Sequence, residues 1–200
     1  MLLGASHVWG AGLEHDAYLK ARSLIDEKYQ SHVLSLYGKG PAGDVLTWRV
    51  LFYDPTSPSK ARLVVLNQGK VDRFDSAESS QPYDDRWSFD PLAVTTQLRT
   101  AMDAAQQYAK DHQLSYDENN VLLKRSEAGA APVWRVELRQ SGNAIGFVYT
   151  SSTGTFARYQ AAEKSSGSGA RGFANDVEGT FRGIGGDLEE FFTGKRTVDK

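Results

Sequence analysis

The chain has 200 residues, no cysteine, a formal net charge of −2 and 40% hydrophobic residues. This length is sufficient for a substantial core, and the near-neutral charge argues against the strongly basic surface of proteins that bind nucleic acid or anionic lipid. The lack of cysteine excludes disulfides, thiolate metal sites and a cysteine nucleophile.

The N-terminal segment, residues 1–12, is apolar but too short to cross a membrane, and it has no basic start. It is either the last part of a signal peptide, with Gly10 and Gly12 near the cleavage site, or an ordinary disordered terminus. Both interpretations stay open. No transmembrane segment is predicted.

Residues 13–80 are predicted to form a helix followed by four antiparallel strands. Apolar residues recur at helical spacing within residues 14–29, at Ala17, Ala21, Leu24 and Ile25. Strand-like runs, separated by turn signals that include Gly38 to Pro41 and Asn67-Gln68-Gly69, follow at residues 32–37, 45–53, 61–66 and 71–74.

A polar connector, residues 81–90, leads to a second unit over residues 91–162 with the same predicted order. Its helix has an inward stripe of Leu98, Met102, Ala105, Tyr108, Ala109 and His112. Its strands are predicted at residues 121–125, 133–139, 145–150 and 155–160.

Two sequence signatures occur twice in register. Trp48-Arg49-Val50-Leu51-Phe52 returns 86 positions later as Trp134-Arg135-Val136-Glu137-Leu138, and Gly69-Lys70-Val71-Asp72-Arg73-Phe74 returns 85 positions later as Gly154-Thr155-Phe156-Ala157-Arg158-Tyr159. A duplicated unit that reuses its inward positions explains this. The predicted fold class is therefore α+β, with two tandem helix-plus-four-stranded antiparallel sheet repeats and a C-terminal amphipathic helix. The two sheets would join edge to edge or face each other across the helices.

This pattern of helix, Trp-Arg-Val strand and Gly-x-apolar-x-Arg-aromatic strand resembles the PepSY-like fold. The tandem arrangement is similar to the β-lactamase-inhibitor-protein architecture. The resemblance covers about residues 13–160 and implies an exported, non-enzymatic binding or regulatory module. It therefore implies a periplasmic or secreted location, the alternative being the cytoplasm, and it transfers no catalytic residue.

The composition changes near the C-terminus. Residues 163–172 form a Ser/Gly-rich linker, residues 173–192 are predicted to form an amphipathic helix, and residues 193–200 form a tail. The apolar stripe of that helix is Phe173, Val177, Phe181, Ile184, Leu188 and Phe191. Gly183, Gly185 and Gly186 interrupt it, so we expect it to order only against its own core or another protein.

No pattern in the chain predicts a catalytic site, a metal or a cofactor. Residues 167–172 match Gly-x-Gly-x-x-Gly, but no hydrophobic strand leads into them. The four histidines have no metal-ligand spacing. The acidic pairs lie beside turns or on a solvated face, where charged neighbours are usual.

The candidate partner-binding residues are the C-terminal stripe and three residues of one strand, Arg49, Leu51 and Tyr53. Alternation places these three on the face opposite Trp48, as it places Arg135 opposite Trp134. An apolar and aromatic pair beside arginine is typical of an interface centre. The alternative is that linker or C-terminal residues cover this face. Trp48 and Trp134 are interpreted as core residues, and a ligand-stacking role is their alternative.

The sequence thus favours a non-catalytic, exported protein that binds a protein or peptide. One alternative is an envelope structural protein anchored by its C-terminal helix. Another is a small-molecule carrier that holds its ligand between the two units. Nucleic acid is not an expected partner.

Overall fold

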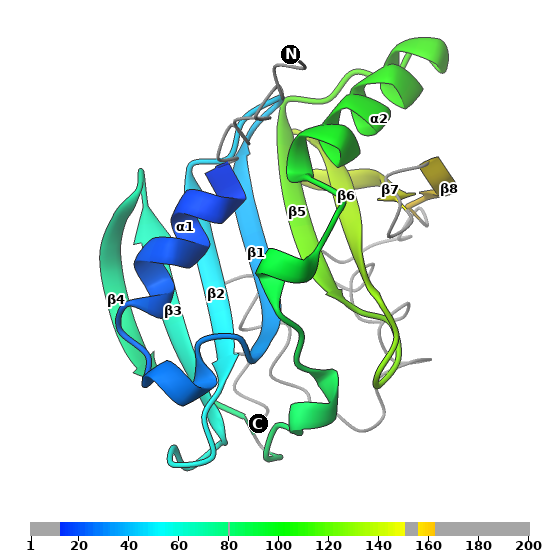
Figure 1. Ribbon diagram of the computed structural model, residues 1–200. Coiled ribbons are helices and arrows are strands. Elements are labelled where there is room, and N and C mark those ends of the chain that lie inside the picture. The colour runs from blue at the N-terminus through cyan, green and yellow to red at the C-terminus, as the bar shows by residue number, and fades with distance from the viewer. Residues whose placement is uncertain (1–12, 80, 151–155, 163–200) are drawn as a thin grey trace, which may run out of the picture.

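The computed structural model describes residues 13–79, 81–150 and 156–162. Within them the helices are α1 (Leu13–Arg22) and α2 (Leu98–Asp111), with short 3-10 helices at Glu27–Tyr29, Asp85–Trp87 and Pro91–Ala93. The strands are β1 (Val33–Pro41), β2 (Thr47–Tyr53), β3 (Ala61–Asn67), β4 (Lys70–Ser76), β5 (Glu118–Arg125), β6 (Pro132–Gln140), β7 (Asn143–Thr150) and β8 (Phe156–Ala161) (Figure 1).

All eight strands form one antiparallel sheet in the order β4-β3-β2-β1-β5-β6-β7-β8. The predicted fold class of two tandem helix-plus-four-stranded-sheet repeats is wrong, because β1 and β5 pair from Leu36↔Leu123 to Pro41↔Glu118 and leave no boundary between two sheets. Pairing satisfies the backbone groups that an open β1 edge would expose. The architecture is α+β, with a single sheet and two described α-helices.

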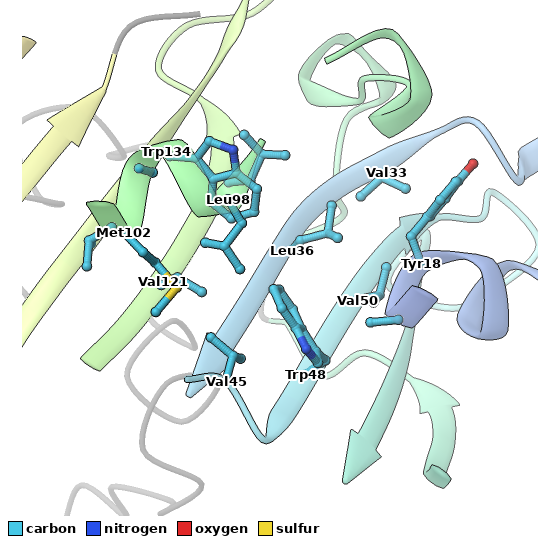
Figure 2. Packing of buried hydrophobic residues seen from close by; sticks show 14 of the residues in the cluster. Tyr18, Val33, Leu36, Val45, Trp48, Val50, Leu98, Met102, Val121 and Trp134 are labelled. Atoms are coloured by element: carbon cyan, nitrogen blue, oxygen red, sulfur yellow. The ribbon is translucent and has the colours of Figure 1, made fainter. Parts of the chain in front are cut away.

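Both helices lie on the same face of the sheet, α1 over β2 and β3 and α2 over β6 and β7 (Figure 1). This face carries the main core. Trp48 on β2 and Trp134 on β6 are only 3% and 1% exposed, which confirms their interpretation as core residues (Figure 2). Trp134 Nε1 donates to the carbonyl of Thr96 at 2.9 Å, so its polar atom is satisfied where it is buried.

The helix predicted over residues 14–29 is shorter in the structure and is followed by a separate turn. The Asp26 side chain accepts from the Lys28 amide and caps the 3-10 helix Glu27–Tyr29. Ile25 still reaches the core, whereas Leu24 is exposed. A side-chain cap therefore overrides the continued helical periodicity.

β1 continues through the segment that was predicted as a turn, Gly38 to Pro41. Gly38 faces the core, where an added Cβ would lie 2.6 Å from Val45 Cγ1 and 2.8 Å from Val121 Cγ2. The glycine therefore serves close packing under Trp48 instead of ending the strand. The turn predicted at Gly69 is present, with φ of 72°.

Helix α2 buries Leu98, Ala101, Met102, Ala105 and Ala109. His112 was predicted to belong to this stripe but is exposed, because the helix ends at Asp111. Glu14 of α1 accepts from the Leu98 amide at 2.9 Å, so a carboxylate from one helix satisfies the first amide of the other.

Candidate functional site

The three sequence-predicted residues of β2 all lie on the face of the sheet opposite the helices, as expected. Leu51 is buried in a small cluster with Leu34, Ala61 and Ala77, against which Tyr53, Leu63, Tyr83 and Trp87 pack. Part of this cluster comes from the connector, which the sequence analysis did not expect to cover this face. The linker and C-terminal residues of the alternative interpretation lie outside the described residues. Tyr53 also meets the Tyr29 ring edge-on at 6.4 Å between centroids.

Arg49 lies outside that cluster and belongs to a row that crosses the whole sheet. Strand register aligns one residue from each strand on the helix-free face, in the order Arg73, Val65, Arg49, Tyr37, Leu122, Arg135, Tyr149 and Arg158. We call these eight residues the arginine row. Four guanidinium groups alternate with apolar and aromatic side chains, which neighbouring strands hold about 5 Å apart.

Guanidinium groups lie near aromatic rings along this face. The Arg158 Cζ atom is 4.4 Å from the Tyr149 ring centroid, and the Arg135 Cζ atom is 5.4 Å from that of Phe147. Arg49 lies 6.0 Å from the Tyr37 ring. Such contacts hold the arginine planes near the sheet, where guanidinium groups can recognise carboxylates in a bidentate manner.

The row is exposed at its ends and buried at its centre. Arg73 and Arg158 are exposed, whereas Tyr37 and Arg135 are only 3% and 9% exposed. Burial lowers the pKa of Arg49 from its ordinary value, and the charge of Arg73 acts in the same direction. The guanidinium groups nevertheless remain cations.

Lys124 adds a further cation on the same face, diagonal to Arg135. Burial lowers its pKa to about 7, and the charge of Arg135 contributes to the shift. The centre of the helix-free face therefore disfavours additional positive charge. A negatively charged group placed there would relieve this cost.

One carboxylate network lies beside the row. Glu137 is buried next to Arg139, and the Asn120 amide donates to its Oε2 at 3.3 Å. Burial raises the pKa of Glu137, while Arg139 acts against that shift. Arg139 also lies 3.1 Å from Glu118, which pairs with Lys39 at 3.3 Å. In this network two carboxylates face two cations. Glu137 also interacts with Arg135 of the row, and Arg73 of the row pairs with Asp75, so the row already lies beside carboxylates.

A second polar cluster lies at the start of β1. His32 Nδ1 is 2.7 Å from Asp85 Oδ1, and the Ser88 hydroxyl donates to the same oxygen at 2.8 Å. The serine is thus bonded to the aspartate instead of the histidine, which is not the order that activates a serine nucleophile. The described residues contain no group of three or more His, Cys, Asp or Glu suited to a metal ion.

The C-terminal stripe, Phe173, Val177, Phe181, Ile184, Leu188 and Phe191, lies outside the described residues, as do residues 1–12 and 163–172. Within the part of the chain that is described, no helix is long and apolar enough to span a membrane.

No family model, no curated protein and no solved structure matches the chain. The PepSY-like resemblance stays a prediction.

Alternation along each strand predicts that Arg49 and Arg135 point outward, but it does not align them or the other members of the arginine row. A signal was nevertheless present. All four arginines of the row belong to the two repeated signatures, Arg49 and Arg135 to one and Arg73 and Arg158 to the other. The repeat preserves outward arginines as well as inward apolar residues.

Proposed function

We propose that the protein is a non-catalytic binding module for a protein or peptide partner, and that its docking surface is the arginine row. The alternation of four arginines with apolar and aromatic side chains across one face carries this proposal. Arginine and aromatic residues are enriched at the centres of protein interfaces. An extended or helical segment with acidic and apolar side chains matches this chemistry.

A protein partner fits the row better than nucleic acid does. Two aromatic or apolar members at its centre, Tyr37 and Leu122, are buried, so they offer no open ring on which a base could stack. Glu137 and Glu118 add carboxylates on the same face, and the whole chain has a net charge of −2. A nucleic-acid surface needs a uniformly basic face.

Selection from a random peptide library against the full chain tests this function. We expect the selected peptides to combine Asp or Glu with Phe, Trp or Leu. Their affinity should fall about tenfold or more in Arg73→Glu/Arg158→Glu, because rim charges steer and orient an acidic partner. The matched control is Arg99→Glu/Lys110→Glu, which reverses two exposed cations on α2 and should leave the affinity unchanged.

Three outcomes would overturn the proposal. They are a selection without acidic peptides, an equal loss in both double variants, and competition by single-stranded nucleic acid for the row. The envelope assembly role and the small-molecule carrier remain the alternatives raised by the sequence. Native mass spectrometry of the purified chain tests the carrier, and export stays a prediction that fractionation of the source cells checks.

A further inference from the structure

The composition of the arginine row restricts the chemistry of a segment that can bind to it. Its centre combines buried apolar side chains, such as Leu122, with the guanidinium of Arg135, although both α-helices pack on the other face of the sheet. A matching occupant needs apolar groups for the centre and carboxylates within reach of the arginines.

The chain contains a segment with this chemistry outside the described residues. Residues 173–192 have five acidic residues and one arginine, a net charge of −4, in addition to six apolar residues at helical spacing. The acidic residues are Asp176, Glu178, Asp187, Glu189 and Glu190. Charge and hydrophobicity are therefore both complementary to the row.

The segment is also tethered where it can reach the row. Described structure ends at Ala162, directly after the edge strand β8. The three strand spacings from β8 to β5 amount to about 14 Å. The ten residues 163–172 span up to about 35 Å when extended, so the tether is long enough. A helix over residues 173–192 would be about 30 Å long, comparable with the width of six strands.

We infer that residues 173–192 bind the arginine row of the same chain and that an external partner must displace them. This inference rests on the docking surface proposed above and adds its regulation. The bound segment occupies the docking surface, and a partner with a more acidic or more apolar segment displaces it by competition. Because the tether makes the contact intramolecular, even a weak contact can compete with a partner in solution.

Paramagnetic relaxation in the full chain tests the contact directly, since the chain has no cysteine of its own. A nitroxide at Gly179→Cys, opposite the apolar stripe, should broaden the side-chain Nε–H signals of Arg49 and Arg135 more than the amide of Lys110 in α2. A mixture of isotope-labelled protein without nitroxide and nitroxide-labelled protein without isotope reports only contacts between molecules. It therefore distinguishes the tethered contact from binding to a second copy. Broadening that occurs only between molecules, or equally at Lys110, would overturn the inference.

Charge reversal in the segment provides the second arm. Asp187→Lys/Glu189→Lys/Glu190→Lys should abolish the broadening and raise the affinity of a selected acidic peptide about fivefold or more, within the usual range of coupling between binding events. Phe181→Asp/Leu188→Asp should act in the same direction. The matched control is Glu27→Lys/Glu78→Lys/Glu127→Lys, three exposed glutamates outside the row, which should change neither quantity.

The two proposals fail in different ways. If acidic peptides bind the row but the nitroxide shows no contact, the regulation is wrong and the function stands. If the contact is present but no peptide binds even the charge-reversed variant, the segment is a permanent part of the fold and both displacement and the binding function are wrong.

Discussion

The two faces of the sheet bury different kinds of side chain. The face under α1 and α2 is a continuous hydrophobic core that includes Trp48 and Trp134. The helix-free face buries the small apolar cluster around Leu51 and, besides it, the polar side chains of Arg135, Glu137 and Tyr37. Every strand contributes to both faces because successive side chains alternate.

The comparison separates stability from recognition. Burial of apolar surface is non-directional and stabilises the helix-covered face. Buried charged groups add little net stability, because desolvation opposes their pairing, but they make a surface selective for one kind of partner. We therefore expect substitutions on the first face to change unfolding, and substitutions on the second to change binding and pH dependence.

Trp134→Ala should produce the largest loss of stability. Removal of this buried ring leaves a cavity and removes the hydrogen bond to the Thr96 carbonyl, at a cost of about 3–5 kcal/mol in the free energy of unfolding. Urea unfolding measures the change. Leu92→Ala, at a half-exposed residue, is the control and should be nearly neutral. An unchanged unfolding midpoint in Trp134→Ala would contradict the core described here.

Lys124→Met should stabilise the protein at neutral and acidic pH, and the gain should vanish above about pH 10.5. The folded pKa of about 7 lies below the ordinary 10.5, so a proton on Lys124 disfavours folding. The loss of folding stability caused by this proton is largest below about pH 7. It decreases between pH 7 and 10.5 and is absent at higher pH. We expect a gain of about 2–4 kcal/mol below pH 7, since one pKa unit is about 1.4 kcal/mol. Urea unfolding across this pH range checks it, with the exposed Lys110→Met as control.

Gly38→Ala tests how closely the helix-covered face is packed. The new methyl group would overlap the branched side chains of Val45 and Val121, which have little freedom to move. We expect a loss of about 1–3 kcal/mol, typical of overpacking. Thermal unfolding measures it. A variant as stable as the wild type would mean that the β1 and β5 junction can relax.

Arg158→Ala should have the smallest effect on folding. It removes an exposed guanidinium 4.4 Å from the Tyr149 ring, a contact of about 0.5–1 kcal/mol. Its effect on peptide affinity should exceed its effect on unfolding, whereas Trp134→Ala should show the reverse. If Arg158→Ala lowered stability as much as Trp134→Ala does, the division between the two faces would be wrong.

Local patterns predicted most elements but not their ends. Alternation from Trp48 to Phe52 located β2, and helical spacing located α2. The missed boundaries depend on specific contacts. Asp26 caps a new turn after α1, and Val45 with Val121 requires glycine inside β1. Neither contact has a signal in hydrophobic periodicity.

By itself the sequence determined which side chains point inward, because alternation and helical spacing are properties of adjacent residues. It also placed arginines on the outward face of β2 and β6. Only the tertiary structure decided that β1 pairs with β5, and hence that the chain has one sheet. That pairing joins residues that lie from 118 − 41 = 77 to 123 − 36 = 87 positions apart and aligns the four arginines in a single row. Long-range register arises from satisfying backbone hydrogen bonds across strands, which no local pattern encodes.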